Sequence, residues 1–517
     1  MNTAVGRYAM YTNVNGDRNV AIGDYALYTM NPASDADTKN VAVGKNAMYA
    51  TTTGPLNTAV GYNVMEANTT GTDNVPIGHQ VLDANTTGGE NCAVGTHALG
   101  GNTTASYNTA VGTQALTDNT TGANNVAMGY KALANNTTAS GNVAIGREAM
   151  LTNVTGHTCT AIGDKALRTM DAAYYNVAVG YYTLYDCTTG SRNVSVGNES
   201  SKGITTGNDN IGIGYEALAT NSTGNSNTAV GKDALQFNNG NSNTAIGAFA
   251  MEDATTAATN TAVGYFALGA AACAAEDCVA VGAHAAEDVT TGSYTVAVGR
   301  NAGKNITTGQ RNTVVGHDAG GAITTSGMNT LIGNRAMISG SGDSNVMIGK
   351  SAGESGSYNA SGNTFVGYYA GDAATTGGNN VCLGQESDKS AVDASNEITL
   401  GNSSISAIRA QVTSISSLSD KRDKKDIKDS TYGLDFVDSL KPVTFEWDQR
   451  DGNRSGVKDV GFIAQDLQEV DDEYTRLVYE SNPDKLEATY GRLIPIMAKA
   501  IQELSAEVKE LKKQING

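Results

Sequence analysis

The stretch "NTAVGTQALTDNTTGAN" (residues 108–124) holds one complete unit of a repeat that runs through most of the chain. Its first five letters recur, with small variations, as Asn, then Val or Thr, then Ala, then Val or Ile, then Gly. The closing glycine occurs 24 times between Gly6 and Gly401, and almost all copies are 17 residues apart. A fixed period of this length indicates stacked units, each of which contacts only its neighbours.

The rest of the unit is patterned as well. Ala-Leu or Ala-Met follows the glycine after three residues, as in Ala132-Leu133, and a turn rich in Thr and Gly comes next. We therefore predict two short strands per unit, separated by polar turns in which Asn and Gly allow a positive φ. Because alternate strand residues face opposite sides, the Val or Ile in the fourth position is expected to fill the coil, with the Ala facing outward. After residue 299 the Ala-Leu pair often becomes Ala-Gly, which we interpret as a change of core width.

Composition excludes several classes of function. The net charge is −18, which gives no support to nucleic-acid binding. No apolar run approaches the ~18 residues that span a bilayer, and the first residues have no signal-peptide pattern. The six cysteines share no fixed spacing and form no C-x-x-C. We therefore predict no nucleic-acid partner, no membrane insertion, no metal site and no cofactor.

The charged run "SSLSDKRDKKDIKDS" (416–430) marks the end of the repeat. Beyond it, residues 432–448 predict a short helix and a strand with Phe445 and Trp447 on one face, and residues 459–470 predict a strand that turns into a helix. The predicted domains are a β-roll shaft over 1–401, a connecting strand or linker over 402–418, and a domain over 419–517. The fold class is mostly β: an elongated β-roll or β-solenoid of about 24 seventeen-residue repeats, trimeric, followed by a small α+β domain that ends in a coiled-coil helix.

The last segment, 493–515, carries a heptad seam of apolar residues with spacings of 3 and 4. The seam comprises Ile494, Met497, Ile501, Leu504, Val508, Leu511 and Ile515. One reading is that this face packs on its own domain. We favour a coiled coil of identical chains, because a single helix would leave the seam in water and a slim repeat also needs partners. The seam alone does not separate dimer from trimer, and the choice of a homotrimer depends on the β-roll resemblance described next.

Two resemblances follow from these patterns. The repeat resembles the β-roll heads of trimeric autotransporter adhesins and the shafts of bacteriophage tail fibres. Residues 396–517 resemble the endosialidase-type intramolecular chaperone domain that closes many phage tail fibres and tailspikes. This second resemblance depends on the spacing S-D-x-R-x-K-x-x-I, present as Ser419, Asp420, Arg422, Lys424 and Ile427, and on "GFIAQ" at 461–465.

The resemblance to the chaperone implies a domain that trimerises, assembles the shaft and then cuts itself off. Carried over to this chain, Ser419 is the nucleophile, Lys424 is its base, and the cut falls between Leu418 and Ser419, a single-turnover serine peptidase reaction without an external substrate. A lysine can act as base if burial lowers its pKa. Neighbouring aspartates, including Asp420, oppose this, and the alternative is a solvated charge run. Some members of such families keep the fold and do not cut.

The function expected from the sequence is that of a trimeric phage tail fibre or host-adhesion protein, located in the virion and made in the host cytoplasm. Its expected partners are itself, a host-cell surface receptor and other virion proteins. The alternative is a bacterial trimeric surface adhesin with a non-cleaving trimerisation domain, although no signal peptide or membrane anchor supports it. An enzyme acting on glycans would need an irregular insertion, and the repeat is broken substantially only near 31–39. An ice-binding repeat would need flat rows of Thr, whereas Thr clusters in turns here.

Overall fold

The structure is a computed structural model that describes residues 1–270, 273–355, 358–405, 407–409, 419–449, 455–480, 484 and 486–517. The chain divides into two compact units, residues 1–329 and residues 330–517, which are described one at a time. Among the described residues, no helix is long and apolar enough to cross a membrane.

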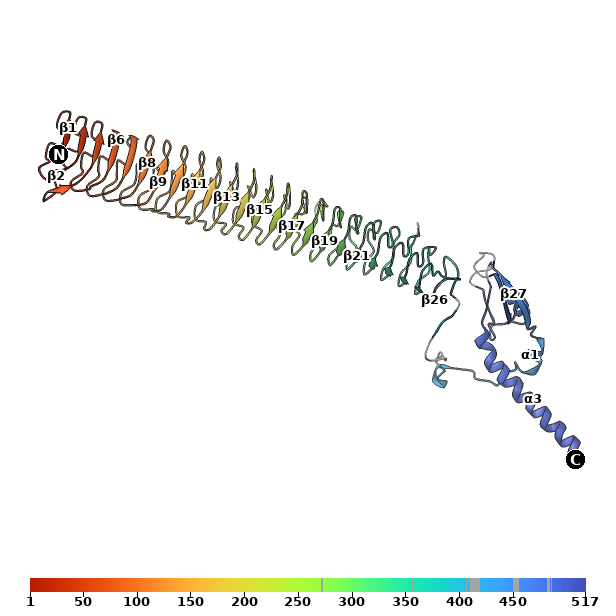
Figure 1. The fold of residues 1–517 in the computed structure, drawn as a ribbon. Helices are drawn as coiled ribbons and strands as arrows, with labels where there is room; N and C mark the ends of the chain where they lie inside the picture. Colours follow the sequence, from red (N-terminus) through yellow and green to blue (C-terminus); the bar gives the residue numbers. More distant parts are fainter. Residues whose placement is uncertain are drawn as a thin grey trace. The chain divides into compact units, whose positions relative to one another are not determined.

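The first unit is a β-solenoid with one short parallel strand in each turn (Figure 1). Successive strands pair residue by residue, so that Thr109, Ala110 and Val111 lie beside Val126, Ala127 and Met128. The insertion near 31–39 adds a small parallel pair, β2 (Gly16–Asp17) with β4 (Ala36–Asp37). The solenoid strands of this unit are β1 (Thr3–Val5), β3 (Val20–Ile22), β5 (Val41–Val43), β6 (Thr58–Tyr62), β7 (Val75–His79), β8 (Cys92–Val94), β9 (Thr109–Val111), β10 (Val126–Met128), β11 (Val143–Ile145), β12 (Thr160–Ile162), β13 (Val177–Val179), β14 (Val194–Val196), β15 (Ile211–Ile213), β16 (Thr228–Val230), β17 (Thr244–Ile246), β18 (Thr261–Val263), β19 (Val279–Val281), β20 (Val296–Val298) and β21 (Thr313–Val315).

The second unit begins with five more turns of the same kind. Their strands are β22 (Thr330–Ile332), β23 (Val346–Ile348), β24 (Thr364–Val366), β25 (Val381–Leu383) and β26 (Ile398–Leu400). The predicted β-solenoid is therefore confirmed, with 24 repeat strands in total.

The closing glycine of each unit ends the strand in a conformation that excludes a side chain. Gly146 has φ of +136°, and a Cβ built on it would lie 2.3 Å from the carbonyl oxygen of Gly163 in the next turn. The same contact recurs from turn to turn, so the stacking of backbones explains why the pentapeptide always ends in Gly.

The predicted facing of the strand was wrong. The middle Ala is the inward residue, and Ala110, Ala127 and Ala144 are fully buried. The flanking residues point outward, and Ile22 and Ile162 expose 40% and 38% of their surface. The interior is already occupied by the Ala-Leu pair of the same turn, which leaves room for little more than a methyl group beneath the strand.

The second predicted strand is also absent from the described turns. The Ala-Leu step is a tight turn in which Lys131 and Leu133 have φ of 56° and 51°. This left-handed conformation costs a non-glycine residue roughly 1–2 kcal/mol. Backbone bonds to the neighbouring turns offset that cost, as when the Leu133 amide donates to the carbonyl of Ala149 at 2.9 Å.

In the later turns the core exchanges large and small positions. Gly371 replaces the usual Leu, and Phe365 replaces the usual strand Ala. Phe365 is fully buried, and a Cβ on Gly371 would lie 2.2 Å from its ring. In this turn the large side chain has moved into the strand, so the core stays filled. In the turn of Gly303 the strand keeps its Ala, and a Cβ on Gly303 would lie 2.7 Å from the buried side chain of Ile306 instead.

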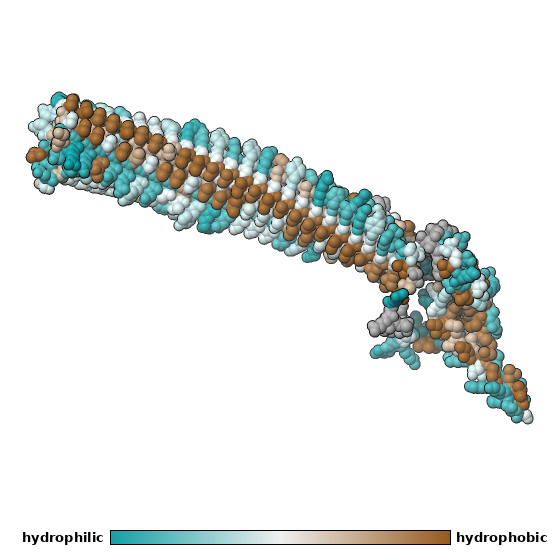
Figure 2. All heavy atoms as spheres, in the orientation of Figure 1, coloured by the Kyte–Doolittle hydropathy of each residue, from teal (hydrophilic) through white to brown (hydrophobic). Residues whose placement is uncertain are grey.

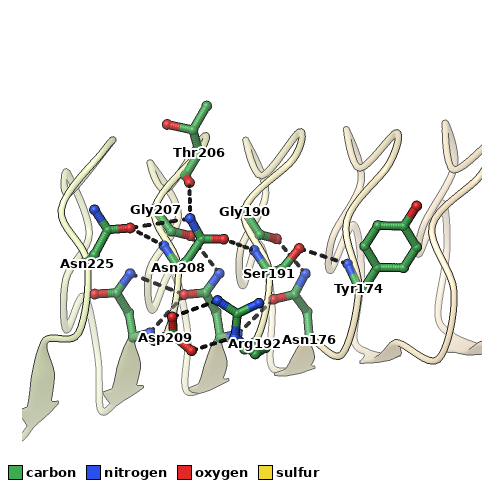
Figure 3. Close-up of polar contacts among 12 residues, drawn as sticks. Tyr174, Asn176, Gly190, Ser191, Arg192, Thr206, Gly207, Asn208, Asp209 and Asn225 are labelled. Atoms are coloured by element: carbon green, nitrogen blue, oxygen red, sulfur yellow. Dashed lines mark hydrogen bonds and ion pairs between the residues drawn. The ribbon is translucent and has the colours of Figure 1, made fainter.

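A ladder of buried asparagines joins successive turns. Asn176 donates through Nδ2 to the carbonyl of Gly190 at 2.8 Å, and its Oδ1 accepts from the backbone amide of Asn193 at 2.8 Å (Figure 3). A second, more exposed ladder runs beside it, in which Ser191 and Asn208 accept backbone amides from the preceding turn. The first Asn of each pentapeptide thus satisfies two buried backbone groups.

The last turn of the solenoid ends differently. Glu397 stands where the ladder asparagine would be, and its amide donates to Asn380 Oδ1 at 2.9 Å. The nearly buried Lys389 donates its ammonium to the carbonyl oxygens of Thr376, Val392 and Ala394. A cation therefore satisfies backbone acceptors that would otherwise face the end of the stack.

The C-terminal part is a small α+β domain around a modest core. Leu467, Leu477, Val478, Leu493 and Ile496 form that core. The predicted helix and strand over 432–448 and the strand and helix over 459–470 are both present. The elements are η1 (Lys421–Asp423), α1 (Leu434–Ser439), β27 (Val443–Asp448), β28 (Ser455–Gly461), α2 (Ala464–Gln468), β29 (Val478–Tyr479), β30 (Glu487–Ala488), η2 (Tyr490–Arg492) and α3 (Leu493–Asn516).

Candidate functional site

The candidate nucleophile and base lie in direct contact. Lys424 donates from Nζ to Ser419 Oγ at 2.6 Å. The single turn η1 bends the chain between them, and the amide of Lys424 donates to the carbonyl of Lys421 at 3.2 Å. The spacing of five residues therefore places Lys424 Nζ within hydrogen-bond reach of the Ser419 hydroxyl, the proximity that a Ser-Lys pair requires.

The motif residues Asp420 and Arg422 build this turn. Asp420 caps η1 by accepting the backbone amide of Arg422 at 2.8 Å, and the Arg422 guanidinium pairs with the same carboxylate at 2.6 Å. The Arg422 side chain holds the pKa of Asp420 below its usual value. One of the aspartates near Lys424 is thus already neutralised by an arginine.

The surroundings of the pair are open in the single chain. Ser419, Lys424, Asp423 and Asp426 are all exposed, and Ile427 exposes 59% of its surface. Leu418, on the other side of the predicted cut, lies outside the described residues. The contact geometry of a dyad is therefore present in the single chain without the burial that would make its lysine a base.

The heptad seam of α3 is exposed along its whole length. The seven seam residues expose between 40% and 79% of their surfaces. The opposite side of the helix, at Leu493, Ile496 and Ala500, is buried against the domain. The reading in which the seam packs on its own domain is therefore wrong, and the helix presents a continuous apolar edge outward.

Contacts within the domain fix the orientation of α3. Glu503 accepts the backbone amide of Leu434 at 2.7 Å, which caps the start of α1 from the middle of α3. An apolar hollow of about 400 Å³ lies alongside, lined by Val437, Leu440, Phe462 and the seam residue Met497. Sequence reasoning missed Glu503, because its partner is 69 residues away and no local pattern marks the pair.

Comparison with protein families identifies the C-terminal segment. Residues 419–478 match the family described as "Chaperone of endosialidase". The match begins at Ser419, the first residue of the motif. It implies assembly into a trimer and, together with the solenoid, supports a fibre-like protein. No curated protein matches the chain.

Proposed function

We propose that this protein is a trimeric phage tail fibre whose C-terminal domain assembles three solenoids and then cuts the chain between Leu418 and Ser419. The observation that carries the proposal is the exposed seam of α3. Seven apolar side chains on one helix edge need a partner of the same pattern, and knobs-into-holes packing with identical helices supplies it.

The proposed cut is an acyl shift followed by hydrolysis. Ser419 Oγ attacks the carbonyl carbon of Leu418 while Lys424 Nζ accepts the hydroxyl proton. The bond from Leu418 carbon to Ser419 nitrogen breaks, the nitrogen takes up a proton, and an ester links the two residues. Water then cleaves the ester and leaves a carboxylate on Leu418 and a free Ser419 hydroxyl. Atoms and charges balance without a cofactor.

Assembly would supply what the single chain lacks. Lys424 can accept a proton only if its charged form is disfavoured, and burial between subunits does this. Cutting would therefore follow trimerisation, so that only assembled fibres are released from the domain.

The test of cleavage is the mass of the purified product. Wild type should yield fragments of 418 and 99 residues, since 517 − 418 = 99. Ser419→Ala and Lys424→Met should leave the chain intact. Lys425→Met is the matched control and should cut normally, because it leaves the contact between Lys424 and Ser419 in place. An intact wild-type chain in a folded trimer would refute the peptidase and favour the alternative, a bacterial surface adhesin with a non-cleaving trimerisation domain.

The finer assignment concerns location and partners. We propose that the fibre belongs to a virion, where it contacts other virion proteins and a host-cell surface receptor. The similarity of the repeat to fibre shafts and adhesin heads supports this. Antibodies raised against the solenoid should label intact phage particles and block their adsorption. Labelling confined to a bacterial surface would instead support the adhesin.

A further inference from the structure

We infer that the solenoids of three copies pack through their strand faces at equal heights, and that the C-terminal domain sets this alignment. The strand face is defined as the first and third residues of each repeat strand. The inference rests on the proposed trimer and specifies which surface is buried and what the chaperone contributes physically.

The strand face is free of charge over its whole length. In all 24 repeat strands both outward positions hold Val, Ile, Thr, Leu, Met or Cys. Charged residues make up 17% of the chain, yet none occupies the strand face of any repeat strand. We call the strand of one turn, with its two outward residues, a rung. Figure 2 shows the face as an apolar band that follows the strands. Strand surfaces that face solvent usually carry charged residues, which prevent association with other β surfaces. The lack of charge on this face therefore indicates that it is covered.

The size of the band fits an interface between large partners. The first unit alone contributes 19 strands, β1, β3 and β5 to β21. At about 4.8 Å per rung and about 7 Å between the two rows, the band covers about 600 Å². This area lies at the top of the range of about 300–600 Å² that the largest exposed patch of a monomer covers, and such patches often mark interaction sites.

A second copy is the occupant that the band fits. The side chains of the band repeat once per solenoid turn. A second copy of the chain has the same repeat distance, so each strand of one copy can lie against a strand of the other. An unrelated partner would match only a few rungs. The exposed seam of α3 points to partners with the same helix, and the family match points to three of them.

The face does not fix how far one copy can slide along another. Ion pairs such as Arg147 with Asp164 join turns of the same chain. A slip by one rung places β-branched residues against β-branched residues again, at little cost. The register between two copies is weakly specified wherever the contacting residues repeat without a unique feature that marks one position.

The C-terminal domain can supply the missing marker. Three domains held together by α3 are joined to three β26 strands by connections of identical length. The faces then meet first at β26, at the same height, and pair turn by turn toward the N-terminus. The chaperone would act by fixing the starting rung.

Cys92 tests the surface. It is the one cysteine on the strand face, whereas Cys159 and Cys187 are buried, with thiol pKa values raised by burial to about 11 and about 12. A bismaleimide with a two-carbon spacer should join two chains of each wild-type trimer through Cys92, and Cys92→Ser should abolish the product. A sedimenting trimer whose Cys92 is fully modified by a monofunctional maleimide would overturn the inference but not the proposed function. A monomer would refute both.

Mixed trimers test the alignment. A chain lacking three units, residues 108–158, is co-expressed under a different tag with a chain carrying Cys92→Ser and Val143→Cys. Alignment from the C-terminal end places Cys92 of the short chain at the height of residue 143 of the long chain. Alignment from the N-terminal end leaves the two about 14 Å apart, at about 4.8 Å per rung. The expected product joins Cys92 to residue 143.

Two outcomes would overturn the alignment claim. In a second pairing the long chain keeps Cys92 and Val143. The alignment claim fails if Cys92 of the short chain is joined to Cys92 of this long chain and, in the first experiment, is not joined to residue 143. That result would mean that the N-terminal end fixes the register. The claim also fails if the short and long chains do not form mixed trimers while the short chain alone forms a cross-linked homotrimer. That result would show that the strand face itself fixes the register between copies.

Discussion

The asparagine ladder leads to a quantitative prediction at Asn125. Its Nδ2 donates to the carbonyl of Ala139 at 2.9 Å, and its Oδ1 accepts the backbone amide of Asn142 at 3.0 Å. Asn125→Ala removes both bonds. It leaves the buried amide of Asn142 without a partner, whereas the carbonyl of Ala139 still accepts Asn136 Nδ2 at 3.0 Å. The orphaned amide costs about 1–3 kcal/mol and the lost bond to Ala139 about 0.5–1.5 kcal/mol, so the local stability should fall by about 1.5–4.5 kcal/mol.

A natural substitution in the same ladder provides the matched comparison. At Cys159 the sulfur accepts the amide of Asn176 at 3.4 Å and contacts the carbonyl of Ala173 at 3.6 Å. Both contacts are longer than the hydrogen bonds made by a ladder asparagine, yet the amide of Asn176 and the carbonyl of Ala173 each keep the sulfur as a partner. Asn125→Cys should therefore destabilise clearly less than Asn125→Ala.

Hydrogen exchange followed by mass spectrometry measures the effect locally, because a repeat array need not unfold in one step. Peptides covering residues 108–142 should lose protection strongly in Asn125→Ala and weakly in Asn125→Cys. Thr121→Ala, at an exposed turn position, should stay within about 0.5 kcal/mol of wild type. Equal protection in the Ala and Cys variants would refute the hydrogen-bond account.

Three further changes have defined outcomes. Gly371→Leu and Phe365→Ala should each lower the melting temperature, the first by overpacking and the second through a cavity worth about 3–5 kcal/mol, while the double variant should recover much of the loss by restoring the usual Ala and Leu pair. Burial raises the pKa of Asp388 to about 7, so the folded state binds more protons and stability falls as pH rises from about 4 to about 7; melts across this range should flatten in Asp388→Asn. Glu503→Ala removes the acceptor of the Leu434 amide and should lower the urea midpoint of the C-terminal domain, followed at Trp447.

Several features were predictable because they are local or periodic. The 17-residue period fixed the number of turns, and the spacing of five residues brought Lys424 onto Ser419. The heptad spacing located the seam, whose exposure the structure confirms. Each of these depends on residues close in sequence, where geometry follows directly from spacing.

The direction in which the strand faces was not predictable in this way. Alternation shows that Ala110 and Val111 lie on opposite sides, but it does not say which side is inside. That choice depends on the volume that Leu116 of the same turn takes up inside the coil, which is a property of the closed coil. The cap of α1 by Glu503 likewise depends on a contact between distant segments.

Because Lys389 closes the final turn, the number of turns in the solenoid can change without altering how the end of the stack is stabilised. Most earlier turns present the next with the same amides, carbonyls and asparagine oxygens, with exceptions such as Cys159, so adding or removing a 17-residue unit changes few kinds of contact. The reach of such a fibre can therefore change by duplication or loss of single units while its ends and its C-terminal domain stay as they are. Natural length variants, differing by whole units, are the expected evolutionary outcome.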